Sequence, residues 1–109
     1  VVAAVPGHFS ALVQSGLCAQ RLGKPDAAIA FFNQAAALRP DSWMPPYNIA
    51  CVRAQENRLD DSIAHIEKAA RLVPDDVNLI EYMRRDSDLA PLRADPRWSG
   101  LVTKLRSPH

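Results

Sequence analysis

The sequence predicts an all-α fold: a right-handed superhelix of α-hairpins, or α-solenoid, that ends in a C-terminal capping helix. The first observation is an internal repeat, because residues 26–41 recur as residues 60–75 at a constant offset of 34. The second is the identity of the pairs Asp26/Asp60, Ile29/Ile63, Ala30/Ala64, Ala35/Ala69, Ala36/Ala70, Leu38/Leu72, Pro40/Pro74 and Asp41/Asp75. The third is that apolar residues recur at helical spacing. A period of about 34 residues is typical of a helix–turn–helix solenoid.

Composition and charge exclude several classes of partner. The net charge of +1 gives no general attraction to nucleic acid or to an anionic membrane. No apolar run approaches the roughly 18 residues of a membrane-spanning helix. The two cysteines, Cys18 and Cys51, are too few for a disulfide framework, so we expect free thiols in a cytoplasmic protein. No sequence feature calls for a cofactor.

The chain divides into four segments: a lead-in or linker at residues 1–7, a first repeat at 8–41, a second at 42–75 and a capping unit at 76–109. Pro6-Gly7 is typical of a turn before the first helix, expected from about Phe9 to Leu22. Gly23 suits the left-handed end of that helix, and Pro25 suits the first turn of the next. This second helix, ending near Leu38, is apolar nearly all round, so we expect neighbours on two of its sides.

The second repeat should contain helices at about 43–56 and 59–73, with Asp41-Ser42 as the cap of the first and Pro45-Pro46 in its first turn. Asn57 tolerates the left-handed conformation required between the two helices.

The capping unit departs from the repeat. We expect a helix at residues 77–85 capped by Asp75-Asp76, a turn at 87–92, and a last helix at 97–105 capped by Asp95. An end unit must cover the last core face and present a polar one to water, which explains the departure.

Two spaced motifs suggest a family. Small-x3-large patterns followed by proline occur as Ala28-x3-Phe32…Pro40 and Ser62-x3-Ile66…Pro74, and Ser15-Gly16 and Ile49-Ala50 occupy the place of a Leu-Gly pair. The chain therefore resembles the tetratricopeptide repeat, closely in the second helices and loosely in the first. YNIAC at 47–51 and DSDLAPLRADPRW at 86–98 resemble the closing segment of such arrays in bacterial multidomain proteins.

The resemblance implies a protein-interaction module in which the first helices line a concave groove. The corresponding groove positions are Ser10, Val13, Gln14, Leu17, Gln20 and Arg21, then Met44, Tyr47, Asn48, Cys51 and Gln55, then Asn78, Glu81, Tyr82 and Arg85. Some relatives clamp a terminal carboxylate, but only Asn48 matches that residue set. The lining instead favours a hydrophobic peptide or an amphipathic helix of a protein partner.

Purely structural roles are alternatives to partner binding for several of these residues. Tyr47 and Tyr82 are the leading contact candidates, although either ring could simply pack between helices. Trp43 and Trp98 are expected as core or cap anchors. The histidines His8, His65 and His109 are scattered, and the aspartate clusters fall where helices begin, so we expect no catalytic set, no metal site and no enzyme.

One alternative function stays open. The chain could be a structural or oligomerisation arm of a larger enzyme or regulator, with its groove filled by its own chain, for example by the apolar lead-in VVAAVPGHF. A homo-oligomer is possible on this alternative. On either interpretation, we expect the module to be part of a larger protein.

Overall fold

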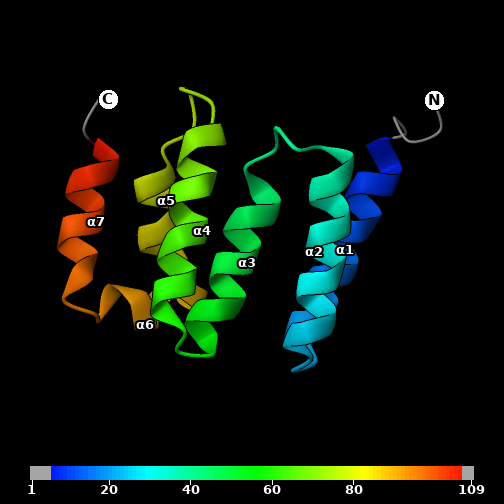
Figure 1. Cartoon of the computed structure of the whole chain (residues 1–109), viewed down its shortest axis with the longest axis horizontal. Helices are drawn as coiled ribbons and strands as arrows, with labels where there is room; N and C mark the ends of the chain where they lie inside the picture. Colours follow the sequence, from blue (N-terminus) through cyan, green and yellow to red (C-terminus); the bar gives the residue numbers. More distant parts are fainter. Residues whose placement is uncertain (1–5, 107–109) are drawn as a thin grey trace.

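The computed structural model describes residues 6–106 and shows an all-α chain (Figure 1). Its helices are α1 (Pro6–Arg21), α2 (Pro25–Leu38), α3 (Met44–Gln55), α4 (Leu59–Leu72), α5 (Leu79–Arg85), the 3-10 helix η2 (Ser87–Leu89), α6 (Ala90–Arg93) and α7 (Arg97–Arg106). No strand occurs within this range. None of these helices has both the length and the apolar character that crossing a bilayer requires. The predicted all-α helical-repeat fold is confirmed.

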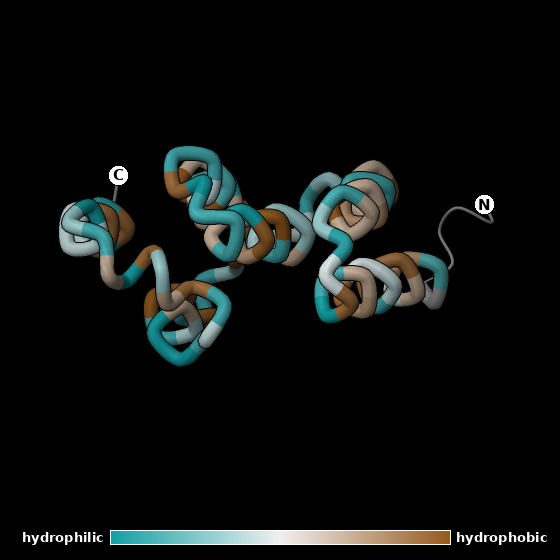
Figure 2. Tube along the Cα trace, turned by 90° about the horizontal axis from the view of Figure 1, so that it is seen from below, coloured by the Kyte–Doolittle hydropathy of each residue, from teal (hydrophilic) through white to brown (hydrophobic). Residues whose placement is uncertain are grey.

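The helices form two layers. Viewed end-on, α2 and α4 lie on one side, α1 and the α5–α6 segment lie on the other, and α3 runs between them (Figure 2). The molecule measures 42 × 32 × 20 Å, and its smallest dimension equals about two helix diameters of roughly 10 Å each. The helix α7 packs against α4 and α6 at the C-terminal end. The helices α1 and α5 therefore lie on the same side of the molecule, with α3 between the two layers.

The turns inside the two hairpins repeat the same geometry. Gly23 has φ 75° and Asn57, 34 positions later, has φ 61°. The next residue in each copy, Lys24 or Arg58, donates its amide hydrogen to the carbonyl five residues earlier, at 2.9 and 2.8 Å. These are the bonds of a helix end closed by a left-handed residue. The expected left-handed turns are confirmed in both repeats.

The small-x3-large residues are the centre of each hairpin. Ala28, Phe32, Ser62 and Ile66 are all fully buried, at 0% exposure. The small residue lets the second helix approach the first, and the large residue fills the space one turn later. The spacing read from the sequence therefore marks the core contacts of both repeats.

Gly16 on α1 allows a close approach of α1 and α2 in the first hairpin. A β-carbon built at Gly16 would lie only 2.4 Å from Cε1 of Phe32. At the equivalent positions of the second hairpin, Ala50 replaces the glycine and the smaller Ile66 replaces the phenylalanine. In the second hairpin, the residue on the first helix is therefore larger than in the first hairpin, and the residue on the second helix is smaller.

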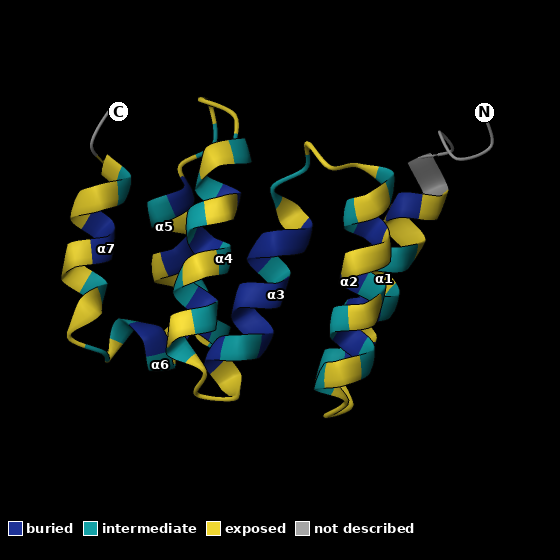
Figure 3. Cartoon of the chain, in the orientation of Figure 1, coloured by how far each residue is buried: buried dark blue, intermediate teal, exposed yellow. Residues whose placement is uncertain are grey.

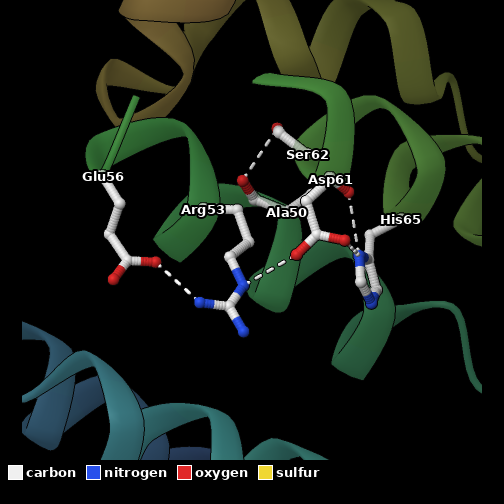
Figure 4. Close-up of polar contacts among 6 residues, drawn as sticks. All are labelled: Ala50, Arg53, Glu56, Asp61, Ser62 and His65. Atoms are coloured by element: carbon white, nitrogen blue, oxygen red, sulfur yellow. Dashed lines mark hydrogen bonds and ion pairs between the residues drawn. The ribbon is translucent and has the colours of Figure 1, made fainter. Parts of the chain in front are cut away.

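Polar contacts also join α3 to α4 (Figure 4). The Ser62 hydroxyl donates to the carbonyl oxygen of Ala50 at 2.9 Å, so this buried hydroxyl is satisfied. On the rim of the interface, Arg53 forms ion pairs with Glu56 at 2.8 Å and with Asp61 at 2.9 Å. The second hairpin is therefore held by a buried hydrogen bond as well as by apolar packing.

The most deeply buried helix is α3 (Figure 3). Its buried residues are Pro45, Pro46, Tyr47, Ile49, Ala50, Cys51, Val52 and Ala54. The helix α2 does pack on two sides, against α1 and α3, as its apolar sequence predicted. Because α3 also contacts α4, η2 and α6, it is the central element of the molecule.

Some predicted helix boundaries were wrong. Residues 1–5 of the predicted lead-in lie outside the described residues, and Pro6 and Gly7 begin α1 instead of forming a turn. At the other end, α5 begins at Leu79, and its cap is Asn78 instead of Asp75-Asp76. The Asn78 side chain accepts the Glu81 amide hydrogen at 3.1 Å. Residues 75–77 form a turn instead, which displaces the helix start by two residues.

The start of α3 follows the prediction in part. The Ser42 hydroxyl accepts the amide hydrogen of Met44 at 3.3 Å, and Pro45-Pro46 do lie in the first turn. Asp41 makes no capping bond to this helix among the described residues, since the helix begins one residue later than expected.

Replacing Gly16 by alanine should destabilise the protein. We expect Gly16→Ala to lower the free energy of unfolding by about 1–2 kcal/mol, measured by urea denaturation. Overpacking against Phe32 costs about 1–3 kcal/mol and exceeds the up to about 1 kcal/mol that alanine's helix propensity returns. The matched control is Gly100→Ala in α7, where an added β-carbon meets nothing within 4 Å. Equal stabilities of the two variants would contradict the close approach at Gly16.

Candidate partner-binding surface

The structure separates the predicted groove residues by exposure. Ser10, Gln14, Arg21, Met44, Gln55, Asn78, Glu81, Tyr82 and Arg85 are exposed; Leu17, Gln20 and Asn48 are half-buried; Val13, Tyr47 and Cys51 are buried. Tyr47, a leading contact candidate from the sequence, is only 3% exposed. The three buried residues are therefore part of the core in this conformation and do not form an open contact surface.

The buried Tyr47 binds an acidic residue of the capping unit. Its hydroxyl donates to Oδ2 of Asp86 at 2.6 Å, and the thiol of Cys51 points at the same oxygen at 3.6 Å. Tyr47 and Cys51 lie four residues apart and so share one face of α3. Asp86 follows directly after the end of α5. The YNIAC and DSDL sequence runs therefore meet through this carboxylate.

Asp88 continues the contact to the first repeat. Its two carboxylate oxygens accept hydrogen bonds from Gln55 of α3 at 3.0 Å and from Gln20 of α1 at 3.1 Å. Gln20 also donates to the side-chain oxygen of Gln55 at 3.0 Å. We call residues 86–88 the acidic segment. The chain itself thus bridges α1 and η2.

The residues that follow hold the acidic segment in place. Leu89 and Leu92 are fully buried and belong to the main core cluster with α3 and α4. Arg93 donates to the carbonyl oxygens of Met83 at 2.8 Å and Asp86 at 2.6 Å. A cation at these carbonyls is favourable, because they lie at the C-terminal end of α5.

Burial and negative charge shape the electrostatics of this cluster. Burial, and then the neighbouring charge of Asp86, raise the pKa of the Asp88 carboxyl above its ordinary value. Burial is also the main cause that raises the pKa of the Tyr47 hydroxyl and of the Cys51 thiol, with the nearby carboxylates adding to it. Tyr47 and Cys51 therefore remain protonated hydrogen-bond donors at neutral pH.

The cluster does not fit a metal site. The side-chain ligand atoms of Cys51, Asp86 and Asp88 lie within 4.8 Å of one another. However, all four carboxylate oxygens already accept hydrogen bonds from protein donors. The raised pKa of the Cys51 thiol also disfavours the thiolate that a metal requires. Neutral donors around two carboxylates instead favour a hydrogen-bonded contact between chain segments.

Three aromatic rings stack edge to face beside this contact. The centroids of Trp43 and Tyr47 lie 5.6 Å apart, those of Trp43 and Tyr82 5.4 Å, and those of Tyr47 and Tyr82 5.3 Å. Tyr82 is nevertheless 49% exposed, and Met44, the chain neighbour of Trp43, is 39% exposed. We call Trp43, Met44 and Tyr82 the aromatic patch. A shallow pocket of about 500 Å³ adjoins it, lined by Tyr82, Arg85, Asp86 and Ser87.

The predicted aspartate caps divide into two groups. Asp86 accepts the amide hydrogen of Asp88 at 3.0 Å, and Asp95 accepts that of Arg97 at 2.9 Å, as expected of caps. Arg97 also pairs with Asp60 of α4 and holds the pKa of Asp95 below its usual range. Asp60 lies in the first turn of α4 without capping it. Trp98 packs on the main core cluster, in agreement with its expected anchoring role.

One role of the acidic segment was not predicted from the sequence. Asp86 was interpreted only as a helix cap, whereas its second oxygen binds Tyr47. Two sequence runs could have indicated this contact. One is YNIAC, with tyrosine and cysteine four residues apart, and the other is DSD, with two aspartates after a helix end. Periodicity alone does not show that two such runs meet.

Comparison with known proteins supports the repeat. Residues 9–42, which include nearly all of α1 and the whole of α2, match the family described as tetratricopeptide repeat. No curated protein matches the chain, and no solved structure does.

Removing the Tyr47 hydroxyl should weaken the contact with the capping unit. We expect Tyr47→Phe to lower the free energy of unfolding by about 1–3 kcal/mol in urea denaturation, because a hydrogen bond to a charged acceptor is lost. Tyr82→Phe is the matched control, since this exposed hydroxyl makes no hydrogen bond to the described residues; its change should stay within about 0.5 kcal/mol. Similar losses in both variants would count against the contact.

Proposed function

We propose that the chain is a protein–protein interaction module without catalytic activity, because residues 9–42 match the tetratricopeptide repeat family. Repeats of this family generally mediate protein–protein interaction. In this proposal the module binds a peptide or a helix of a protein partner on its concave face, and it works as part of a larger protein.

The observation that carries this proposal is the exposure of the aromatic patch. Tyr82 and Met44 keep 49% and 39% of their surface open although they adjoin a packed aromatic cluster. Edge-to-face contacts hold the Tyr82 ring in place, so little conformational entropy remains to be lost on binding. Tyrosine, tryptophan and methionine are also enriched at the cores of protein interfaces.

In this proposal the groove extends from the patch toward α1. Its lining would be the exposed Gln14 and Arg21 and the half-buried Leu17 of α1, with the half-buried Asn48 of α3. Gln20 and Gln55 are occupied by Asp88, so they are not free for a ligand. An amphipathic helix with its apolar side on the patch and its polar side toward α1 suits this distribution.

A second function is supported by the bridge between Gln20 and Asp88. Since the chain fills part of its own concave face, the module could serve as a structural or oligomerisation arm of a larger enzyme or regulator. The filler on this alternative would be the acidic segment; residues 1–5 of the apolar lead-in, the filler that the sequence suggested, lie outside the described residues. Light scattering separates the two functions, because an arm that joins copies should give a dimer.

Changing the aromatic patch should abolish partner capture. We expect a partner that the wild type retains from host lysate to be reduced at least tenfold with Tyr82→Ala/Met44→Ala, because anchor side chains carry most binding energy. Quantitative mass spectrometry of the captured proteins gives the readout.

The control for this capture is Leu22→Ala, which removes a side chain that is 71% exposed but lies in the turn between α1 and α2. The control should retain the partner. Equal capture by the wild type and the double variant, together with a dimer in light scattering, would replace the proposal with the structural arm.

A further inference from the structure

One face of α3 is covered by the first hairpin. Ile49 and Val52, which are 4% and 2% exposed, belong to one core cluster with Ala28 and Phe32 of α2. Pro45 lies four residues before Ile49 on the same face of the helix, and it is fully buried as well. This face of α3 therefore shows how one hairpin of the chain stacks on the hairpin before it.

The equivalent face of α1 is open in the part of the chain that the structure describes. The residues 34 positions earlier are Ala11, Ser15 and Cys18. Ala11 and Cys18 are exposed, and Ser15 is half-buried. The helices α1 and α2 form the end of the molecule opposite α7 (Figure 1), and no helix within residues 6–106 takes the place of a preceding hairpin there.

The helix α2 contributes to the same side of the first hairpin. On α4, Ile63 and Ala70 pack on the core cluster to which the capping unit contributes, so they face the next unit of the stack. Their equivalents on α2, Ile29 and Ala36, therefore face α3. At about 100° per residue, a side chain two positions away lies on nearly the opposite side of a helix. That opposite side of α2 carries the half-buried residues Ala27, Phe31 and Leu38.

The six residues on this side of the first hairpin have no charge. We call them the outer face; they are Ala11, Ser15, Cys18, Ala27, Phe31 and Leu38. The end unit of a repeat array needs a polar outer surface to stay soluble. At the other end of the molecule α7 has such a surface, with exposed Arg97, Ser99, Thr103, Lys104 and Arg106. The first hairpin therefore has the surface of an internal repeat and not that of an end unit.

We propose that the outer face is a docking surface for a further helical hairpin of the same repeat type, supplied by the rest of the larger protein. The second helix of that hairpin would pack on α1 as α2 packs on α3. Ser15 and Cys18 are smaller than Ile49 and Val52, so the docking helix has room for bulkier apolar side chains. It should carry no charge at the contact, because burying an unpaired charge is costly.

A second copy of this chain cannot continue the stack in series. The side of α2 that would pack on another hairpin is already covered by α3, and the corresponding side of α4 is covered by the capping unit. The docking hairpin must therefore come from outside the described residues. This inference rests on the proposed function only for the larger protein, and the aromatic patch takes no part in it.

A duplicated first hairpin tests the outer face in register. Residues 8–41 are placed directly before residue 8 of the chain, in place of residues 1–7. The second helix of the added hairpin then precedes α1 at the same offset of 34 residues at which α2 precedes α3. It offers α1 the same side that α2 offers α3.

Cys18 reports whether the outer face is covered, because it is exposed whereas Cys51 is buried. The added hairpin carries Cys18→Ser, and the original Cys18 is labelled with 4,4′-dithiodipyridine, with the labelled site assigned by mass spectrometry. Its rate should fall about tenfold or more relative to the 109-residue chain, since labelling now requires local opening. In the matched control only the added hairpin keeps Cys18, which should react as fast as in the 109-residue chain.

A charge on the outer face should remove this protection. In the original hairpin of the extended chain, Ser15→Glu should restore fast labelling of Cys18. The control is Ala30→Glu on α2, where protection should persist, because Ala30 and its equivalent Ala64 are both exposed. Each rate is divided by that of the same variant in the 109-residue chain, and circular dichroism establishes that both variants fold.

Protection of the original Cys18 alone, lost with Ser15→Glu and kept with Ala30→Glu, supports the docking surface. Equal labelling of the original and the added Cys18 would overturn it, as would protection that survives Ser15→Glu. Light scattering tests a second copy as the occupant: a dimeric 109-residue chain with a protected Cys18 would show that two copies cover each other's outer faces, and it would overturn the proposal too. Capture through the aromatic patch is measured separately, so failure here is distinguishable from failure of the proposed partner binding.

Discussion

The hydrogen bond between Tyr47 and Asp86 is the contact on which the rest of this structure depends. It joins the central helix α3 to the segment that closes the stack. The helix α3 packs against both helices of the first hairpin and against α4 of its own hairpin. The tyrosine is buried at 3% exposure, so its hydroxyl needs a partner inside the protein. The carboxylate supplies that partner and also caps the 3-10 helix that follows. The same residue therefore ends one helix, begins the next and fixes both against the core.

This contact also places the acidic segment against α1 and α3. A regular third hairpin would continue α5 beside α3, but α5 ends after seven residues and the chain turns back toward α3 through η2. The bond from Gln20 to Asp88 bridges α1 and η2, while Tyr82 and Met44 remain exposed. The departure from the repeat thus caps the stack and leaves these two side chains open to solvent.

Most of the fold could be predicted from the sequence, because it is encoded in local spacing. The offset of 34 residues located both hairpins, the left-handed turns at Gly23 and Asn57 and the buried pairs that begin at Ala28 and Ser62. The burial of Tyr47 could not be predicted in this way, since it depends on a tertiary contact with a residue 39 positions later. The start of α5 was misplaced for a similar reason: several aspartates could cap a helix there, and packing selected Asn78. Exposure of the groove residues likewise depends on where the capping unit folds back.

The most direct test of this account is a double-mutant cycle between Tyr47→Phe and Asp86→Ala, with the free energy of unfolding measured by urea denaturation. If the hydroxyl and the carboxylate form the central contact, the two losses should not add, and the coupling free energy should be about 1–2 kcal/mol. The double variant would then be little less stable than Asp86→Ala alone. A coupling free energy near zero would show that the two residues act independently, and it would contradict the central role of their hydrogen bond.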